Sequence, residues 1–377
     1  MRKLFPLFAL LCLLLAGCVF RLPSATAPTT QPVPTGWQEL DGQRYYYDAT
    51  GKPTVGWIET AEGRFYTDSQ GVLQLGFVTV GEQTYYLPTD GTVLTGWQTL
   101  DGKKLCFTED GALHSGWLEQ TDATYYLQQG EPVTGWQDIG EQRYFFAADG
   151  AMHIGWLEYE GDRYFFRPDG RMAKGKVQVS DTEVRYFTST GKEVILVNPW
   201  NFMPEDYTVN VVAHNGYRVA EECLAPLKAM LSACKKAGHV ALVRSSFRTH
   251  DDQIYLFENK VKYYMNKGYS REEAEKLTSK VNAIPGTSEH ELGLAVDLVD
   301  RDYQKLNEKQ ETMPAQKWLM EHSWEYGFIL RYPNDKTDVT GIIYEPWHYR
   351  YVGTELAAEL HECGLCLEEY LEALTEE

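Results

Sequence analysis

Two short stretches near the C-terminal end of this 377-residue chain combine residue types that can hold a metal ion and activate water. Residues 288–297 read Ser-Glu-His-Glu-Leu-Gly-Leu-Ala-Val-Asp, and residues 345–348 read Glu-Pro-Trp-His. Catalytic zinc sites keep three such nitrogen or oxygen ligands and leave the fourth position to water or substrate. The residues that we predict for this chemistry are the zinc ligands His290, Asp297 and His348 and the general base Glu345.

The spacing of apolar residues predicts the elements that position these groups. Residues 293–299 and 347–352 both alternate like β-strands, which puts Asp297 on the face opposite to its apolar neighbours and separates His348 from Trp347. We therefore expect Asp297 and His348 to share one face of a sheet, with His290 brought in by a loop. The alternative for either stretch alone is a chance match to a surface histidine, a turn acid or a core histidine.

Both stretches resemble motifs of the VanY-like D-alanyl-D-alanine carboxypeptidases, within the lysostaphin, D-alanyl-D-alanine peptidase and hedgehog superfamily of zinc enzymes. The resemblance covers residues 199–374 and includes Gly-Phe-Ile-Leu-Arg-Tyr-Pro at 327–333 and the segment 345–353. Ser-Ser-Phe-Arg-Thr at 245–249 is similar to the family's Ser-Gly-Tyr-Arg-Ser but departs from it at three positions. The resemblance implies a Zn²⁺ peptidase whose substrate pocket includes Gln253 and Ser288.

Arg248 is the candidate for reading the substrate, because an exopeptidase has to recognise a free carboxylate. Its guanidinium could pair with the terminal carboxylate of a peptide or polarise the scissile carbonyl, and the sequence does not choose between these roles. The alternative is that Arg248 only forms a salt bridge on the surface.

Residues 198–377 are predicted to form an α+β domain with a small antiparallel sheet. A strand is expected at 239–247, and apolar spacing predicts the helices. Their expected ranges are 217–237, 250–265, 271–281, 313–326 and 355–374, the last broken near Gly364.

Residues 36–197 repeat every 20 residues, with one step of 19. A Gly-Trp pair, an aromatic cluster and a turn glycine keep this phase, which predicts eight stacked β-hairpins in a solenoid. The chain is therefore multidomain, with a repeat solenoid ahead of the α+β domain.

The repeats resemble choline-binding and glucan-binding repeats of Gram-positive surface proteins. Their aromatic rings could surround a quaternary ammonium group in a box or stack on sugars. Some of these rings must instead pack against each other between neighbouring repeats. Phe77, Leu105-Cys106 and Lys176 interrupt the pattern, so their units are expected to lack a full box. The predicted ligand aromatics are Trp37, Trp57, Trp97, Trp117, Trp136 and Trp156.

The N-terminus predicts export and anchoring. Residues 1–18 combine a basic start, an apolar run and Leu-Ala-Gly-Cys, which is typical of a lipoprotein signal with a lipidated Cys18. An ordinary secretory signal is the alternative. Residues 19–35 are rich in Pro and Thr and predict an extended tether.

The acidic composition suits a soluble domain outside the cell. The net charge of −19 argues against nucleic acid as a partner. Beyond the signal segment, Cys106, Cys223, Cys234, Cys363 and Cys366 are expected to be buried apolar residues or to include one disulfide.

Together these features predict a lipid-anchored zinc carboxypeptidase on the outer face of a Gram-positive membrane. It would trim D-alanine from peptidoglycan stem peptides while its repeats hold wall choline or polysaccharide. L,D-carboxypeptidase or endopeptidase action on the same site stays open. The alternative function is that of a non-catalytic wall-binding or adhesion protein. The presence of all four site residues, His290, Asp297, Glu345 and His348, argues against this alternative.

Overall fold

The computed structural model describes residues 33–375 and places them in two compact units. One unit holds the residues up to 115 together with 128–131, and the other holds 116–127 together with 132–377. The predicted signal segment, Cys18 and nearly all of the tether lie outside the described residues. Within 33–375, none of the helices is long and apolar enough to cross a membrane.

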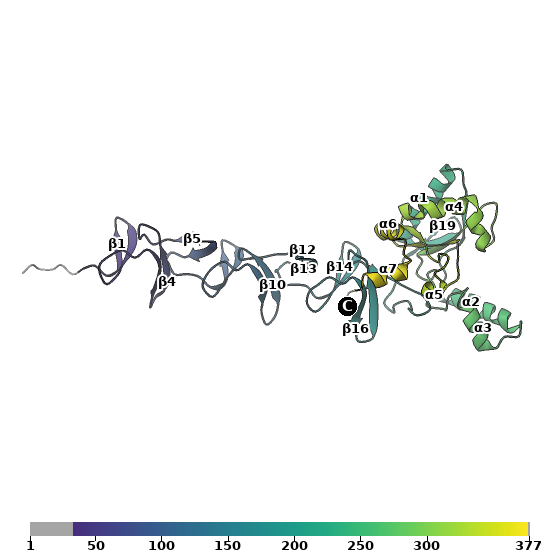
Figure 1. The fold of residues 1–377 in the computed structure, drawn as a ribbon, viewed down its shortest axis with the longest axis horizontal. Helices are drawn as coiled ribbons and strands as arrows, with labels where there is room; N and C mark the ends of the chain where they lie inside the picture. Colours follow the sequence, from purple (N-terminus) through teal and green to yellow (C-terminus); the bar gives the residue numbers. More distant parts are fainter. Residues whose placement is uncertain (1–32, 376–377) are drawn as a thin grey trace, which may run out of the picture. The chain divides into compact units, whose positions relative to one another are not determined.

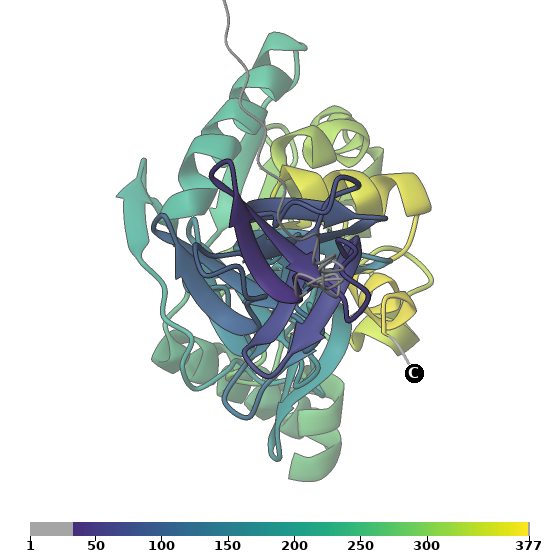
Figure 2. The ribbon, with the colours of Figure 1, turned by 90° about the vertical axis from the view of Figure 1, so that its left-hand side faces the viewer.

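The repeats form eight antiparallel β-hairpins, as the 20-residue period predicts (Figure 1). The first four of them are separate two-stranded sheets, whose strands appear in purple and blue in Figure 2. The hairpin strands are β1 Gly36–Leu40 and β2 Gln43–Tyr47, β3 Gly56–Thr60 and β4 Gly63–Thr67, β5 Gly76–Val80 and β6 Gln83–Leu87, β7 Gly96–Leu100 and β8 Lys103–Phe107, β9 Gly116–Glu119 and β10 Thr124–Gln128, β12 Gly135–Ile139 and β13 Gln142–Phe146, β14 Gly155–Tyr159 and β15 Asp162–Phe166, and β16 Gly175–Ser180 and β17 Glu183–Phe187. Two short strands, β11 Glu131–Pro132 and β18 Glu193–Val194, accompany them.

Local chemistry explains these hairpins. Asp41 and Gly42 close the first one with φ of 51° and 75°, the left-handed pair that a tight hairpin turn needs. Neighbouring repeats are joined by backbone hydrogen bonds, such as Leu73 N–H to the Arg44 carbonyl (2.8 Å) and Met172 N–H to the Arg143 carbonyl (2.9 Å). Each repeat also buries only a few side chains, so its stability depends on stacking against the next one.

The α+β domain is built on a four-stranded antiparallel sheet in the order β21-β22-β24-β23, as the sequence predicts. Its strands are β21 Ala241–Ser245, β22 Ala295–Asp300, β23 Phe328–Leu330 and β24 His348–Tyr351, with a separate hairpin of β19 Val211–His214 and β20 Tyr217–Ala220. The helices are α1 Glu221–Lys236, α2 His250–Met265, α3 Arg271–Thr278, α4 Pro314–His322, α5 Thr337–Thr340, α6 Thr354–Cys363 and α7 Leu367–Ala373, with 3-10 turns η1 Glu308–Thr312 and η2 Ser323–Tyr326.

The predicted start of the first helix is wrong. Residues 217–220 were expected to start the first helix, but they form β20, because pairing with β19 supplies backbone partners that a helix start leaves unpaired. The helix α1 begins at Glu221.

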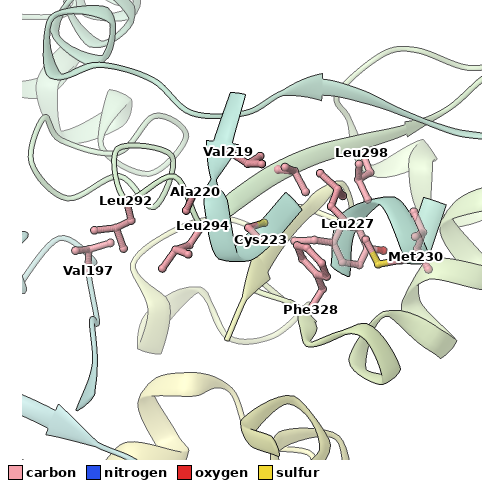
Figure 3. Packing of buried hydrophobic residues seen from close by; sticks show 13 residues of the cluster. Val197, Val219, Ala220, Cys223, Leu227, Met230, Leu292, Leu294, Leu298 and Phe328 are labelled. Carbon is pink, nitrogen blue, oxygen red and sulfur yellow. The ribbon is translucent and has the colours of Figure 1, made fainter. Parts of the chain in front are cut away.

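Apolar side chains of the sheet pack against α1 and form the core of this domain (Figure 3). Leu227 and Met230 of α1 meet Leu298 of β22 and Phe328 of β23. Cys223 belongs to the same cluster. All five cysteines among residues 33–375 are free, and four of them are buried, so they act as small apolar residues rather than as a disulfide.

The last repeat contacts the α+β domain within the second compact unit. The backbone N–H of Lys176 donates to Thr375 Oγ1 (2.9 Å), and Ser189 Oγ donates to Glu359 (2.9 Å). Arg185, nearly buried, pairs with Glu193 and Asp206. The predicted boundary at 197/198 stays a prediction, because side chains on both sides of it share these contacts.

Candidate metal and peptide site

Strand register brings two of the predicted ligands together. β22 and β24 are antiparallel with Asp297 directly opposite His348, and Asp297 Oδ1 lies 3.1 Å from His348 Nδ1. His290 Nε2 lies 3.4 Å from the same oxygen. The three side chains are buried, and one ligand atom from each lies within 4.8 Å of the others. The predicted shared face is confirmed by this register.

A tight turn delivers His290 to the sheet. Residues 288–293 are tied by hydrogen bonds such as Gly293 N–H to the His290 carbonyl (3.2 Å). Gly293 has φ of 74°, and a Cβ there would meet the Ala220 backbone nitrogen at 3.1 Å, so only glycine fits. His290 Nδ1 lies 2.9 Å from the Ser246 carbonyl, to which it donates its proton. The Nε2 lone pair therefore faces Asp297.

His348 is oriented by a residue that sequence reasoning missed. Its Nε2 lies 3.2 Å from Oε2 of Glu289, which accepts its proton and leaves Nδ1 to face Asp297. Glu289 is fully buried, and its Oε1 also accepts from Arg331 (2.6 Å) and Arg350 (3.0 Å). Burial alone would raise the pKa of Glu289, but the two guanidinium groups lower it below its usual range.

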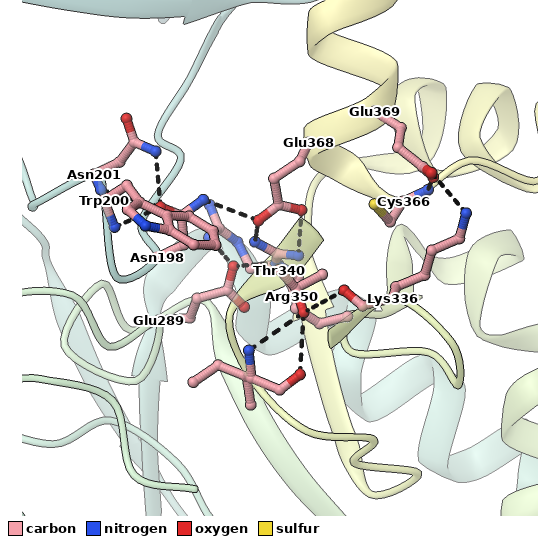
Figure 4. Close-up of polar contacts among 12 residues, drawn as sticks. Asn198, Trp200, Asn201, Glu289, Lys336, Thr340, Arg350, Cys366, Glu368 and Glu369 are labelled. Atoms are coloured by element: carbon pink, nitrogen blue, oxygen red, sulfur yellow. Dashed lines mark hydrogen bonds and ion pairs between the residues drawn. The ribbon is translucent and has the colours of Figure 1, made fainter. Parts of the chain in front are cut away.

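The Glu289 network reaches beyond the sheet (Figure 4). Arg331 also donates to Glu368 of α7 (2.8 and 2.6 Å), and Asn198 donates to the same carboxylate (3.1 Å). Arg350 donates to the Ile195 carbonyl (3.0 Å). The orientation of His348 thus depends on the C-terminal helix as well as on the sheet.

The donor set fits a zinc ion. Two imidazole nitrogens and one carboxylate oxygen face a common point, and the second nitrogen of each ring is held by an acceptor. Burial and nearby Arg248 lower the pKa of His290 to about 4, so this ring is neutral at pH 7. Burial opposes protonation of His348, but Asp297 and Glu289 raise its pKa to about 9, so a metal ion has to displace that proton.

Glu345 lies beside the cluster rather than in it. Its Oε2 is 3.8 Å from His348 Nδ1, and its side chain is 12% exposed. Its backbone is held by the Tyr332 carbonyl (3.1 Å). Burial raises the pKa of Glu345 to about 8, although His348 opposes the shift. A carboxyl group in such surroundings can exchange a proton near neutral pH.

Arg248 flanks the cluster from the other side. Its Nη2 is 3.6 Å from Asp297 Oδ2, and its Nη1 donates to Gln253 Oε1 (2.9 Å). Gln253 is fully buried and donates in turn to the Ala283 carbonyl (2.7 Å). Gln253 thus holds Arg248 in place, and the part in the substrate pocket that the family resemblance implies for it stays a prediction. Thr249 caps α2 directly after the arginine, which fixes the backbone there.

These groups line one cavity of about 330 Å³. Arg248, Ser288, Glu345 and the three predicted ligands lie on its wall. Tyr332, also missed from the sequence, lines it and places its ring 4.8 Å from that of His348. A cavity of this size can admit the end of a peptide and exclude much of the water around it.

The six predicted ligand tryptophans occupy equivalent places in the repeats. Each is the second residue of the first strand of its hairpin. Trp37 contacts Tyr46 and Phe65 with ring centroids 5.1 and 4.9 Å apart, and Trp117 contacts Tyr126 and Tyr144 at 5.1 and 5.0 Å. Pairs of neighbouring hairpins therefore do form aromatic clusters.

Family models match both parts of the chain. Residues 216–354 match the VanY family, described as D-alanyl-D-alanine carboxypeptidase. Residues 133–168 and 154–200 match a choline-binding repeat, and residues 35–52 and 76–92 match a putative cell wall binding repeat.

Individual relatives cover the C-terminal half. A D-alanyl-D-alanine carboxypeptidase of Enterococcus faecalis is 42% identical over 180 residues, which is 47% of this chain and 65% of the relative. A putative carboxypeptidase, YodJ, of Bacillus subtilis is 36% identical over 46% of this chain and 63% of its own length. The chain thus spans just under two thirds of these relatives.

Two solved structures each match part of the chain. VanYB in complex with D-alanine-D-alanine is 41% identical, with a TM-score of 0.44, over 48% of this chain and 98% of that one. Choline binding protein F of Streptococcus pneumoniae is 26% identical, with a TM-score of 0.37, over 43% of this chain and 57% of that one.

Proposed function

We propose that this chain, whose C-terminal domain belongs to the VanY family and whose N-terminal hairpins are choline-binding-type repeats, is a zinc D,D-carboxypeptidase of the cell wall. It removes the C-terminal D-alanine from peptidoglycan stem peptides that end in D-Ala-D-Ala. The observation that carries the proposal is the convergence of His290, Asp297 and His348 in one cavity between Glu345 and Arg248.

In this proposal the ligand trio holds Zn²⁺, with His290 contributing Nε2 and His348 contributing Nδ1. The chemistry that a bound zinc ion supplies is Lewis acidity, which makes water acidic near pH 7 and polarises a carbonyl. Glu289 and the Ser246 carbonyl keep the two imidazoles in the required tautomers.

Glu345 is the proposed general base. It takes the proton from the attacking water and returns it to the leaving amine of D-alanine. Its position beside His348, its burial and its raised pKa support this role. Because Glu345 is not part of the group formed by His290, Asp297 and His348, it can serve the reaction without holding the metal.

Arg248 is the proposed reader of the substrate terminus. Its charge faces the cavity while Ser245 and Gln253 hold its guanidinium from behind. A terminal carboxylate placed here would form charge-assisted hydrogen bonds, which are stronger than neutral ones.

Defined stem peptides test the proposed reaction. We expect mass spectrometry to show that the purified chain removes one alanine from the pentapeptide in a zinc-dependent manner. Trimming of the tetrapeptide but not the pentapeptide would instead make the enzyme an L,D-carboxypeptidase, and cleavage inside a cross-linked dimer would make it an endopeptidase. No cleavage of any peptide by the zinc-loaded chain would favour a binding protein.

The repeats and the predicted signal together support a location in the cell wall. We propose that the repeats bind a wall polymer and that a lipidated Cys18 anchors the chain to the outer face of a Gram-positive membrane, because two acyl chains bind a bilayer firmly. Cys18→Ala should then move the protein from the membrane fraction to the medium or leave it unprocessed. Normal cleavage with continued membrane retention would refute the lipid anchor.

A further inference from the structure

The cavity that holds the metal-ligand cluster has a second cation on its wall, which the proposed reaction does not use. Lys260 of α2 lines this cavity, as Arg248 does, and its side chain is half-buried. Glu258, the acidic residue nearest to it in the chain, pairs with Arg271 instead (2.6 Å). Within residues 33–375, no carboxylate forms an ion pair with Lys260, so its charge is available to a ligand in the cavity.

The cavity wall follows the helix α2 from its first turn towards Lys260. Gln253 Nε2 donates to the Ala283 carbonyl (2.7 Å). One turn further along the helix, the Leu256 carbonyl accepts a hydrogen bond from Asn282 Nδ2 (3.4 Å). Because Asn282 and Ala283 both line the cavity, the cavity extends along α2 away from the metal ligands.

The helix also sets the spacing between the two cations. Gln253 and Lys260 are seven residues apart, which puts them on the same face of α2 and about 10 Å apart along its axis. The Arg248 guanidinium is bound to the Gln253 side chain (2.9 Å), so the positions from which Arg248 and Lys260 reach the cavity differ by a similar distance. An extended peptide advances about 3.3 Å per residue, and the spacing therefore matches about three residues of substrate.

A stem peptide carries a carboxylate at this spacing. In the proposed function its C-terminal carboxylate, on the fifth residue, faces Arg248. The second residue, three positions upstream, is a glutamic acid that is joined to the next residue through its γ-carboxyl group. Its α-carboxylate is therefore free, unless the cell wall carries the amide at this place. A lysine ammonium and such a carboxylate form a charge-assisted hydrogen bond.

We propose that Lys260 is a specificity-determining residue that binds the free α-carboxylate of the isoglutamate at the second position of the stem peptide, while Arg248 binds the terminus. Val281, Leu306 and Ile342 also line the cavity and offer this carboxylate no competing charge. The chain thus distinguishes acidic stem peptides from amidated ones. The inference rests on the proposed function and names the form of the substrate that the same cavity prefers.

Two pentapeptides that differ only at the second residue test this proposal. One carries D-isoglutamate and the other D-isoglutamine, and both have L-lysine at the third position and end in D-Ala-D-Ala. We expect the zinc-loaded full chain to show about a tenfold higher kcat/KM for the isoglutamate peptide, mainly through a lower KM, because the contact is remote from the scissile bond. Lys260→Met, which keeps the length of the side chain without its charge, should remove most of this preference, and Lys260→Glu should reverse it.

Lys267→Met is the matched control. The Lys267 ammonium lies 4.4 Å from the centroid of the Tyr263 ring, and the Lys260 ammonium lies 5.2 Å from the same centroid. Lys267 is exposed, however, and lies outside the group of described residues that line the cavity. The control variant should keep the parent preference. If both methionine variants lose it to the same extent, the contact with the tyrosine ring matters rather than a charge in the cavity, and the proposal fails.

Two further results would overturn the proposal: equal kcat/KM for the two peptides with the parent chain, or an equal loss on both peptides in Lys260→Met. A preference that follows a diaminopimelate carboxylate at the third position would also overturn the assignment to the second residue. Cleavage of the isoglutamine peptide reports on the proposed function by itself, so a failed peptidase proposal remains distinguishable from a failed specificity proposal. Calorimetric binding of the two peptides to the Glu345→Gln chain measures the same preference without turnover.

Discussion

The metal-ligand cluster and the repeat hairpins both use strand register to place their key side chains, but they control the availability of those side chains in opposite ways. At the metal cluster, the Ser246 carbonyl and Glu289 occupy one nitrogen of each imidazole, which leaves the other nitrogen facing Asp297. In the repeats, Arg or Lys side chains lie over the tryptophan rings of five hairpins, whereas Thr124 stands at the equivalent place beside Trp117. The comparison teaches that a motif shows which groups are present, while their neighbours decide what those groups can still bind.

The largest expected effects separate the metal ligands from the base. His348→Ala should lose both zinc and peptide cleavage, since it removes one of three ligands. Glu345→Gln should keep zinc but lower turnover by about 10²–10⁴-fold, because only proton transfer is removed. Metal analysis and pentapeptide kinetics measure both. Equal zinc loss in the two variants would show that Glu345 is a ligand.

The second largest expected effect concerns recognition of the C-terminal carboxylate of the peptide by Arg248. Arg248→Ala should lower turnover on the free-acid pentapeptide by roughly 10–100-fold, the expected loss for charge-assisted hydrogen bonds. It should change turnover on the C-terminal amide much less. The control is Arg244→Ala, an exposed arginine on β21. If the parent enzyme cuts amide and acid equally fast, it is an endopeptidase and Arg248 does not read the terminus.

Much of the metal site could be predicted because its information is local. Gly293, the alternation around Asp297 and the Glu-Pro-Trp-His stretch each specify their own backbone, and the expected pairing of Asp297 with His348 is confirmed. The helix over 250–265 was predicted to the residue, since Thr249 and Asp252 form a capping box that is visible in the sequence.

The features that the sequence did not predict depend on contacts between residues far apart along the chain. The role of Glu289 depends on its hydrogen bonds with Arg331 and Arg350, which lie 42 and 61 residues further along the chain. The sequence around His290 does not indicate these bonds. The strand at 217–220 was taken for helix because its pairing with β19 overrides the helical spacing of its apolar residues. The contacts between Arg or Lys and the repeat tryptophans depend on hairpin register, which places each cation diagonally across from a ring.

Glu289→Gln tests whether the buried network matters to the metal. The amide removes the charge that pairs with two buried guanidinium groups and weakens the hold on His348 Nε2. We expect about a 10–100-fold loss of zinc affinity, measured by chelator competition, together with a lower melting temperature of the zinc-free chain. Glu272→Gln on the exposed surface of α3 is the control. Unchanged zinc affinity would show that β22 and β24 position His348 without Glu289.

The smallest expected effect concerns retention on cell walls. The sequence predicts Trp97 and Trp117 as ligand aromatics alike, whereas their surroundings in the structure predict unequal contributions to wall binding. Lys104 lies 4.3 Å from the Trp97 ring, so Trp97→Ala removes a face that an internal cation already covers.

Trp117→Ala removes a ring that is 39% exposed and has Thr124, not Arg or Lys, diagonally across from it. This variant should release the full chain from purified walls at severalfold lower choline concentration. The double variant should then behave like Trp117→Ala alone, since additivity requires that both sites bind. Sedimentation of walls across a choline series measures this. Equal effects of the two single variants would mean that wall ligands displace Lys104 from the Trp97 ring, and the expected contrast between the two tryptophans would fail.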